Sequence, residues 1–373
     1  MQHAQGIAAS GYQPSPLRTG YERIVPQRSG ALFAQTAKEE GVVEKVTSEV
    51  LVIQYASGKK AHIELGRQFG KSANLVFPHT LLSDLKKGAR VKPGDTLAYN
   101  PAFFQPDPLN PKQTLWKQGV ISKVALMEST DTFEDSSAIS EHTAEKLKAR
   151  LTKVRHLFFN FDQTVRGFVT EGQEVTPETI LCTIEEDITT KNDLFDESTL
   201  DTLKLLSGNT PRANYEGVVE RIEVLYYGDK EDMSESLRAL AEASDQRLLK
   251  KQKTLGKPPL TGRLEDTLRI DRQIVELDTL VVKLYISESV GYSTGDKAVF
   301  ANQMKTVTTR IMSGVNETES GQTLDAIFGY TSLNARIILS PELMGTTNTL
   351  LRVLSKRVAE TYFKAQRSEA SKP

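Results

Sequence analysis

The sequence predicts a mainly β protein with a few helices, and three observations support this prediction. The chain has 373 residues, enough for two or three domains at roughly 100–200 residues per domain. Runs of β-branched residues separated by short turns recur along it, and this pattern is typical of strands. Helical periodicity is confined to a few segments, so helices are expected as additions to the sheets.

The cysteine and histidine content excludes several kinds of site. Cys182 is the one cysteine, so neither an internal disulfide nor a thiolate zinc site is expected. No two of the five histidines lie within a helical turn of each other, which excludes the helical two-histidine zinc motif and leaves carboxylate sites open. The sequence contains no apolar run of about 20 residues and no signal-peptide pattern at its start. We therefore expect a soluble protein in a reducing compartment, with no membrane partner.

The charges nearly balance, with 47 basic and 48 acidic side chains, but they are unevenly distributed. Residues 128–201 hold 17 acidic and 7 basic side chains, whereas the rest of the chain is net basic. A surface that faces phosphates is therefore expected only if the acidic stretch points away from it. Two ordinary solvated faces are the alternative interpretation.

Strand patterns begin after an irregular start. The first forty residues are polar and rich in turn formers, and we expect them to form an extended arm. From Gly41, the runs GVVEKV, EVLVIQY and KKAHIEL predict a β meander. Residues 93–113 contain prolines at positions 93, 101, 106, 108 and 111. This stretch is expected to be a loop or the edge of a sheet, because proline lacks a ladder donor.

Two local patterns occur twice. Glycine, valine, proline and leucine have the same spacing in 88–97 and in 172–181, and GVVEKV at 41–46 returns as GVVERI at 217–222. Each pattern is typical of a glycine turn that leads into a strand at the corner of a small barrel or barrel-sandwich. Chance repetition of common strand and turn chemistry is the alternative interpretation.

Helices are expected at two places, with a strand between them. Residues 234–256 begin with Ser234 as an N-cap and end at the sequence GKPP, which stops a helix. TLVVKLYIS at 279–287 predicts a strand. Ser340-Pro341-Glu342 combines a cap, a first-turn proline and an acidic first turn, so it predicts the start of an amphipathic helix. The tail AQRSEASKP is expected to fray.

The segment GYSTGDKAVFANQMKTVTTRIM (291–312) carries Lys297 and Lys305. On one extended strand these lysines would lie about 26 Å apart at ~3.3 Å per residue. They can reach one ligand only if residues 298–304 reverse direction, and Asn302-Gln303 can supply that turn. Two converging ammonium groups would bind phosphate oxygens through charge-assisted hydrogen bonds. Two solvated lysines flanking a hairpin are the alternative.

Two further segments carry residues suited to phosphate or metal chemistry. Phe133-Glu134-Asp135 precedes Ile139-Ser140-Glu141, where a helix is expected to begin. Paired carboxylates can hold magnesium, although acids on a capping loop are usually just solvated. Arg336 lies in an uncharged stretch between Asp325 and Glu342. Its planar guanidinium suits a triphosphate, and a salt bridge to a nearby acid is the alternative.

The order and spacing of these segments resemble the β-type (second-largest) subunit of multisubunit DNA-directed RNA polymerases. That family carries Gly-Asp-Lys with a second lysine eight positions later, a Phe-Glu-Asp-x-x-x-x-Ser-Glu block, and an aspartate eleven positions before an arginine that leads into a helix. The similar residues here are Gly295-Asp296-Lys297, Lys305, Phe133-Glu134-Asp135, Ser140-Glu141, Asp325 and Arg336. Near the start, the similar residues are Thr19-Gly20-Tyr21-Glu22-Arg23, Gly41-Val42-Val43 and Gln5, the last resembling a family glutamine near the RNA.

The resemblance runs from about residue 5 to residue 355 and is weakest in the middle of the chain. Between the two lysines, AVFANQM replaces the family's Arg-His-Gly-rich loop, and GYTSLN replaces an Asn-Pro-Gly turn before the arginine. Counterparts of the family's N-terminal lobes and C-terminal clamp segment are missing. The chain is therefore expected to be a C-terminal-half fragment of a split β-type subunit, of the kind that large tailed bacteriophages encode.

The resemblance implies a double-psi β-barrel core with an inserted flap-like barrel-sandwich domain. The discontinuous core, which would bind the RNA–DNA hybrid, is expected in residues 1–152 and 289–345. The flap-like wall domain is expected in 153–288, and a C-terminal helix and tail in 346–373. The implied activity is template-directed nucleotidyl transfer by a multisubunit enzyme, with no activity expected from this chain alone.

The resemblance also implies the roles of individual side chains. Lys297 and Lys305 would neutralise phosphates of the RNA 3′ end and of the incoming nucleoside triphosphate (NTP), and Arg336 would hold the triphosphate. Asp135, with Glu134 beside it, would lie near the second of two Mg²⁺ ions, which a partner subunit mainly holds. Gln5 would contact nucleic acid together with the two lysines.

The implied partners are a β′-type polymerase subunit, an N-terminal β-type fragment, a C-terminal clamp fragment, the DNA template, the RNA transcript, NTPs and a promoter-specificity subunit. The implied setting is the cytoplasm of an infected bacterial cell, or the virion. Two alternatives stay open at this point. One is a non-catalytic nucleic-acid-binding or virion scaffold with the same fold, and the other is a β-rich oligomerising interaction protein.

Overall fold

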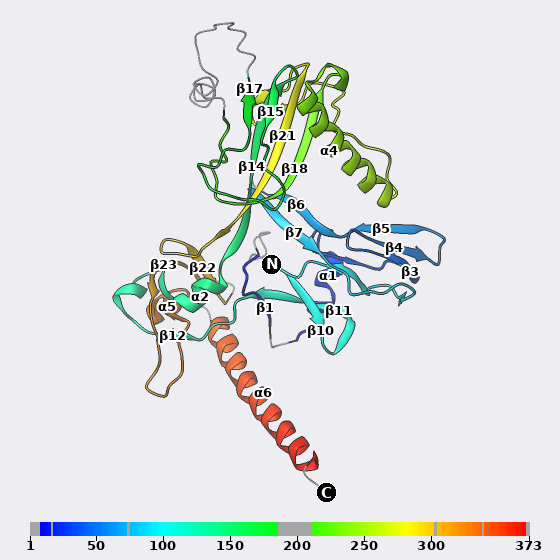
Figure 1. Cartoon of the computed structure of the whole chain (residues 1–373). Helices are drawn as coiled ribbons and strands as arrows, with labels where there is room; N and C mark the ends of the chain where they lie inside the picture. The colour runs from blue at the N-terminus through cyan, green and yellow to red at the C-terminus, as the bar shows by residue number, and fades with distance from the viewer. Residues whose placement is uncertain are drawn as a thin grey trace.

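The computed structural model describes residues 8–15, 18–72, 75–185, 210–301, 304–337 and 339–370 (Figure 1). The chain is mainly β, with 41% strand and 22% helix, and it includes a curled sheet shaped like half a barrel. Three groups of strands make up the body, and one long helix extends away from it (Figure 1). Among the described helices, none has a stretch long and apolar enough to cross a membrane.

The first group of strands is the N-terminal lobe, residues 13–64 and 90–119. Its elements are β1 (Gln13–Pro14), η1 (Tyr21–Arg23), α1 (Val25–Arg28), β2 (Ala34–Thr36), β3 (Gly41–Val46), β4 (Val50–Tyr55), β5 (Lys60–Glu64), β8 (Arg90–Val91), β9 (Thr96–Tyr99), β10 (Phe104–Asp107) and β11 (Asn110–Gly119). The predicted meander is confirmed, because β3, β4 and β5 pair antiparallel in sequence order. Leu51 and Ile53, on the central strand β4 of this meander, are fully buried in the core of the lobe.

The proline-rich stretch includes a sheet edge, as predicted. In the sheet β1-β11-β10 the strand β10 lies at the edge and contains Pro106, while Pro111 is the second residue of β11. The expected extended arm is less regular than a strand, because it folds into the short helical turns η1 and α1. Both turns pack against β11.

The second group is the flap lobe, residues 149–290, whose sheet also takes in β6 and β7. Its elements are β6 (Gly66–Ser72), β7 (Leu75–Leu81), β14 (Ala149–Asn160), β15 (Thr164–Arg166), β16 (Glu174–Val175), β17 (Thr183–Glu185), β18 (Gly217–Tyr227), η3 (Lys230–Asp232), α4 (Glu235–Thr254), β19 (Arg269–Ile270), β20 (Gln273–Ile274) and β21 (Thr279–Val290). The sheet order is β16-β18-β21-β14-β7-β6. β14 and β21 pair antiparallel along their whole lengths, so the chain enters and leaves this lobe through one two-stranded stem. The strand expected at 279–287 is thereby confirmed.

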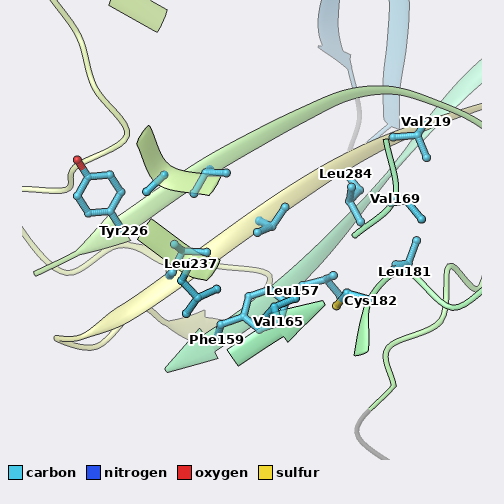
Figure 2. Close-up of a cluster of buried hydrophobic side chains, with 14 of the residues drawn as sticks. Leu157, Phe159, Val165, Val169, Leu181, Cys182, Val219, Tyr226, Leu237 and Leu284 are labelled. Carbon is cyan, nitrogen blue, oxygen red and sulfur yellow. The ribbon is translucent and has the colours of Figure 1, made fainter. Parts of the chain in front are cut away.

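The helix expected at 234–256 is also confirmed and covers the flap core (Figure 2). The side chain of Ser234 accepts a hydrogen bond from the amide of Leu237, and Gly256 follows the helix with a φ of 62°. Leu237 is fully buried with Phe159 and other apolar side chains of the sheet. One face of the helix therefore packs on this lobe's core, while most of its other side chains stay at the surface.

The two repeated sequence patterns meet in the same way in both lobes. In the N-terminal lobe the amide of Gly88 donates to the carbonyl of Val43 at 2.8 Å, and Gly41 pairs with Val91. In the flap lobe the amide of Gly172 donates to the carbonyl of Val219 at 2.7 Å, and Gly217 pairs with Val175. Gly88 and Gly172 have φ values of 85° and 90°, which side chains rarely tolerate. The two patterns are thus two halves of one structural motif, and the halves occur in opposite order along the chain.

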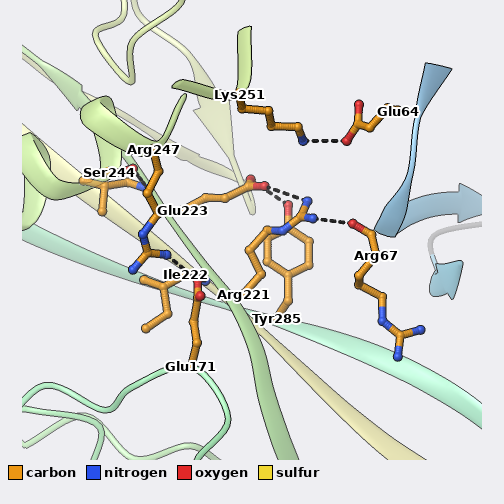
Figure 3. Close-up of polar contacts among 11 residues, drawn as sticks. Glu64, Arg67, Glu171, Arg221, Ile222, Glu223, Ser244, Arg247, Lys251 and Tyr285 are labelled. Carbon is orange, nitrogen blue, oxygen red and sulfur yellow. Dashed lines mark hydrogen bonds and ion pairs between the residues drawn. The ribbon is translucent and has the colours of Figure 1, made fainter. Parts of the chain in front are cut away.

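An ion pair joins the N-terminal lobe to the flap lobe (Figure 3). Lys251 of α4 pairs with Glu64 of β5 at 2.7 Å. Within the flap lobe, Arg221 of β18 donates to the carbonyl of Arg67 on β6 at 2.6 Å, and its guanidinium lies over the ring of Phe69, 4.9 Å from the centroid. The contacts of Arg221 therefore link β18 to β6.

The third group is the site sheet, residues 124–146 and 297–335. Its elements are β12 (Val124–Leu126), η2 (Thr130–Thr132), β13 (Ser136–Ser140), α2 (Glu141–Lys146), β22 (Lys297–Phe300), β23 (Met304–Met312), β24 (Ala326–Phe328) and α5 (Tyr330–Ala335). The strand order is β12-β24-β13-β23-β22. β13 is antiparallel to β24 and parallel to β23, so two distant parts of the sequence interleave. The helix start expected at Ser140 is confirmed, because its side chain accepts from the amide of Thr143 at 3.2 Å.

The last helix, α6 (Ser340–Ala370), begins where the sequence predicts but ends later. The tail expected to fray from Ala365 is helical as far as Ala370. Alanine, glutamine, arginine and glutamate in this stretch have high helix propensity, and neither glycine nor proline interrupts them before Pro373. The expectation of a frayed tail was therefore wrong for these residues.

Buried apolar clusters occur in all three groups of strands. They span residues 25–104, 157–286 and 304–333. The division of the chain into a core of 1–152 with 289–345, a wall of 153–288 and a tail of 346–373 stays a prediction.

Candidate functional site

The two lysines singled out in the sequence lie on one face of the β22–β23 hairpin. Lys297 is directly opposite Val307, and Lys305 is directly opposite Val299. Because residues opposite each other in an antiparallel pair point to the same side, the two lysines are diagonal neighbours, roughly 7–8 Å apart. All four side chains are exposed, while the alternate residues of β23 are buried. The predicted reversal of the chain is therefore present.

The tip of this hairpin falls partly outside the described residues. Asn302-Gln303, which the sequence suggested as the turn, and Gln5, suggested as a nucleic-acid contact, both lie outside them. Phe300 and Met304 close the described part of the hairpin as a pair. The ring of Phe300 lies 5.6 Å from that of Phe328, so the hairpin is anchored to the core of the site sheet.

Gly295 and Asp296 position the first lysine. Gly295 has a φ of 94°, and its amide donates to the carbonyl of Thr308 at 2.8 Å. The carboxylate of Asp296 accepts from the amide of Ser293, and its carbonyl accepts from the amide of Thr308, both at 2.8 Å. The Gly-Asp pair thus forms a tight turn that directs the chain into β22 at Lys297.

Arg336 and Asp135 come together beside the second lysine. The guanidinium of Arg336 donates to the carboxylate of Asp135 and, at 2.9 Å, to the carbonyl of Lys305. The carbonyl of Asp135 accepts from the amide of Val307 at 2.9 Å. The Arg336 side chain is 21% exposed and that of Asp135 is 72% exposed. Four residues predicted from three segments therefore lie at one corner of the site sheet, which we name the cation corner: Lys297, Lys305, Arg336 and Asp135.

Strained backbone surrounds the cation corner. Glu134, Ala301 and Ile337 have φ values of 52°, 44° and 51°, and they are three of the seven non-glycine residues with positive φ in the described part of the chain. Such conformations are costly, particularly for a β-branched residue, and they tend to cluster at functional sites. The carbonyl of Glu134 accepts from the hydroxyl of Ser332, which holds the strained loop against α5. The sequence carries no signal for these conformations.

Asp325, the aspartate upstream of Arg336, has a structural role. Its carboxylate accepts from the amide of Lys123, and its carbonyl accepts from the amide of Ser140, both at 2.8 Å. It therefore ties β12, β13 and β24 together at Ser140, the end of β13 that is opposite to Asp135. The eleven-residue spacing between Asp325 and Arg336 is the length of chain needed to form β24 and α5 between them.

Exposed apolar side chains border the cation corner, a feature that sequence reasoning missed. They are Phe133 (72% exposed), Val299 (47%), Val307 (40%), Tyr330 (48%), Ile337 (93%) and Leu339 (65%). No sequence signal separates these residues from core residues, because the alternation of β22 and β23 does not say which face is buried.

The residues of the cation corner do not fit a complete magnesium site. Asp135 supplies one carboxylate, and that carboxylate is already engaged by Arg336. Across the described ranges, no cluster of three or more histidine, cysteine, aspartate or glutamate side chains is placed to hold a metal. Magnesium prefers several oxygen ligands, and the described residues of the cation corner supply the Asp135 carboxylate, with Glu134 next to it in the sequence.

The chain matches no family model and no curated protein.

Proposed function

We propose that this chain is a fragment of the β-type subunit of a multisubunit DNA-directed RNA polymerase. The observation that carries the proposal is the cation corner. Residues 135, 297, 305 and 336 come from three separate segments of the sequence. The support for the proposal is that Arg336 contacts both the carboxylate of Asp135 and the backbone of Lys305, and that Lys297 lies beside Lys305 on the same face of the hairpin.

The chemistry of the cation corner suits phosphate binding. The site offers two exposed ammonium groups, on lysines that are diagonal neighbours across the hairpin, and one guanidinium. Each of these groups can donate to anionic oxygens at about 1.5–3 kcal/mol per charge-assisted bond. In this proposal Lys297 and Lys305 hold phosphates of the RNA 3′ end and the incoming NTP, and Arg336 holds the triphosphate. Phosphoryl transfer depends mostly on such positioning and charge stabilisation. Mg²⁺ would be held mainly by the β′-type partner, with Asp135 and Glu134 on this side of the site.

The same proposal gives the fold its finer description. The site sheet, with its parallel β13–β23 pair and antiparallel neighbours, would belong to a double-psi barrel, and residues 153–288 would form the flap-like wall. The other parts of the enzyme would be the β′-type subunit, the N-terminal β-type fragment and the clamp fragment. The proposed setting is an infected bacterial cell or the virion of a large tailed bacteriophage.

A second candidate function is a non-catalytic nucleic-acid-binding or virion scaffold derived from the same fold. The loop AVFANQM between the two lysines favours it, because the arginine and histidine of the polymerase family are replaced there. The ion pair of Arg336 with Asp135 also occupies the guanidinium that a triphosphate would need.

Purification from infected cells separates the two candidates. The tagged chain should be isolated and assayed for template-dependent incorporation of labelled NTPs, with the isolated chain as the inactive control. A polymerase fragment should emerge with other large chains, one of which carries an Asp-x-Asp-x-Asp motif, and the mixture should synthesise RNA. Isolation of the chain without such a partner, with nucleic-acid binding but no synthesis, would support the scaffold instead.

A further inference from the structure

Three arginines from three strands of the flap sheet come together inside its curl. Arg221 of β18 donates to the backbone of Arg67 on β6 (Figure 3), although three strands separate β18 from β6 in the sheet order. The sheet therefore curls until these two strands approach each other. Arg150 of β14 contacts the same carboxylate as Arg67, the side chain of Glu220. We name Arg67, Arg150 and Arg221 the arginine cluster.

A β-bulge places the carboxylate that holds two of these arginines. Oε2 of Glu220 lies 3.1 Å from Nε of Arg67, and Oε1 lies 3.4 Å from a terminal nitrogen of Arg150. The pairing of β18 with β21 shifts between Val219 and Arg221, so Glu220 has no partner in that ladder. A bulge redirects a side chain, and bulges are frequent beside functional sites.

The positive charge of the arginine cluster exceeds the negative charge that contacts it. Arg221 is compensated by Glu223 at 3.5 Å, so Arg67 and Arg150 share the single charge of Glu220. Burial lowers the pKa of Arg67, and the charges of Arg150 and Arg221 add to this against the opposing effect of Glu220. Among the described ion pairs, one positive charge of the cluster is therefore left without a carboxylate of its own.

The uncompensated charge lies on the side of the cluster that faces solvent. The side chain of Glu220 is only 10% exposed, whereas those of Arg67 and Arg150 are 35% and 54% exposed. The carboxylate thus holds the two guanidinium groups from the buried side. An anion from solution can reach their exposed side without displacing it.

We propose that Arg67 and Arg150 bind a phosphate group on the solvent side of Glu220. The guanidinium group presents a planar fork of N–H donors that matches phosphate oxygens. A phosphate has oxygens in several directions, so it can bridge two guanidinium groups that come from different strands. Glu220 is then a positioning residue. The phosphate can belong to a free phosphate compound or to a nucleic-acid backbone, and the inference does not depend on the polymerase proposal.

A purely structural role is the alternative that the test must exclude. Arg221 fits such a role, because its guanidinium lies over the ring of Phe69, which stacks on Tyr285 at 4.5 Å. Arg150 does not fit it as well. Its side chain is mostly exposed, and its contact with Glu220 is the longer of the two. Exposed ion pairs of this kind add little to stability, so Arg150 is the residue whose loss separates the two roles.

The test measures phosphate binding by the full chain after the lysines of the cation corner are removed. Lys297→Ala and Lys305→Ala are combined in one background variant. Inorganic phosphate, tripolyphosphate and a single-stranded RNA of eight nucleotides are each titrated into it by calorimetry at low salt. At least one of them is expected to bind, and Arg150→Gln should weaken that binding about tenfold, because it removes charge-assisted hydrogen bonds. No binding of any of the three ligands would overturn the proposal.

Arg247→Gln is the matched control in the same background. Arg247 is another exposed arginine of the flap lobe and pairs with Glu171 at 2.7 Å, so its loss changes the net charge equally. Arg150→Lys keeps the charge without the planar fork and should retain only part of the binding. Thermal unfolding of each variant checks that its fold is intact. Equal weakening by Arg150→Gln and Arg247→Gln would show that net charge governs the binding, and the proposal would fail.

The three ligands separate the two sources of phosphate. If Arg150→Gln weakens the binding of inorganic phosphate or tripolyphosphate, the site accepts a free phosphate compound. If it weakens only the binding of RNA, the site accepts a nucleic-acid backbone, and that binding should fall steeply as salt rises. None of these measurements involves nucleotide addition, so their failure leaves the polymerase proposal to its own test.

Discussion

Arg336 and Asp135, 201 positions apart in the sequence, form an ion pair at the corner of the site sheet. The same guanidinium donates to the carbonyl of Lys305, so it links the loop before β13 to strand β23. Any phosphate that binds Arg336 must compete with a carboxylate that is already there. The pair therefore holds Arg336 in place and at the same time weakens its affinity for anions.

Replacing Asp135 with asparagine should strengthen anion binding by the isolated chain. Exposed ion pairs contribute about 0.2–1 kcal/mol, so the Asp135→Asn variant is expected to bind inorganic tripolyphosphate about 1.5- to 5-fold tighter in calorimetry at low salt. Glu44→Gln is the matched control, because it releases Lys60 from an exposed ion pair in the N-terminal lobe. Equal effects of the two substitutions would mean that net charge, and not Arg336, governs the binding.

Replacing Ile337 with glycine should stabilise the protein. Ile337 has a φ of 51° and its side chain is 93% exposed, so the substitution relieves strain without losing buried contacts. The left-handed conformation costs an L-residue about 1–2 kcal/mol, of which the greater flexibility of unfolded glycine offsets roughly 0.5–1 kcal/mol. Urea unfolding should show a gain of about 0.5–1 kcal/mol.

The control for Ile337→Gly is Val315→Gly. Val315 is also β-branched and is 78% exposed, but its φ is not positive. Its replacement by glycine should lower the free energy of unfolding by roughly 0.5–1 kcal/mol, because only the unfolded chain gains freedom. Destabilisation of similar size in both variants would show that Ile337 is not strained.

A buried carboxylate should make the flap lobe sensitive to alkaline pH. Asp245 of α4 is 3% exposed and accepts from the hydroxyl of Tyr226 at 2.8 Å, from the amide of Gly262 at 2.7 Å and from Lys230. The hydrogen bond to Asp245 raises the pKa of Lys230 above its ordinary 10.5. Burial, with Asp245 beside it, raises the pKa of Tyr226 above 10.0.

Both shifts have the same consequence for stability. A group whose pKa is higher in the folded protein binds its proton more tightly there, so its contribution is complete below the unfolded pKa and is lost as pH rises through the folded one. Urea unfolding should therefore show stability falling above about pH 10, and Tyr226→Phe with Lys230→Met should remove part of that fall. The control is Tyr227→Phe, whose hydroxyl makes no hydrogen bond within the described part of the chain. An identical pH profile for the double variant and the parent would contradict this account.

Cys182 should report the opening of the flap lobe. Its side chain is fully buried in the flap core, and burial raises the pKa of the thiol to about 12. The thiolate is the reactive form, so iodoacetamide at pH 8 should modify the native protein only when the lobe opens. The modification can be followed by mass spectrometry.

Matched core substitutions test whether that opening is local. Val165→Ala creates a cavity in the flap core, and Val43→Ala creates one in the core of the N-terminal lobe; the parent side chains are 6% and 1% exposed. Cavities of this size cost about 1–3 kcal/mol. Val165→Ala should speed alkylation, and Val43→Ala should change it little. Equal acceleration would indicate that the two lobes open together.

Local sequence patterns predicted the elements that depend on nearby residues. The meander β3–β5, the strand β21 and the helix α4 follow from periodicity and capping, which act within a few residues. The hairpin that carries Lys297 and Lys305 could also be predicted from the sequence, because the two lysines can reach one ligand only if the segment between them turns back. The end of α6 was missed because helix propensity outweighed the expectation that a terminus frays.

Contacts between residues that are distant in the sequence could not be predicted from one sequence. The ion pair of Arg336 with Asp135 depends on β13 lying between β24 and β23, an order that no local pattern specifies. The strain at Ile337 depends on how the chain turns after α5. The repeated patterns were visible, but their mutual contacts were not, since the two halves occur in opposite order in the two lobes.

The central proposal is that Lys297 and Lys305 act on one phosphate-bearing ligand, and it is tested most directly by nucleotide addition in the reconstituted complex that we propose to be a polymerase. Lys297→Ala and Lys305→Ala should each be measured at saturating NTP, with Lys60→Ala as the control for loss of an exposed lysine elsewhere. If each ammonium stabilises charge in the transition state, each site variant should lose roughly 10²–10³-fold in rate, and the control should match the parent. Unchanged rates in both site variants would contradict the account.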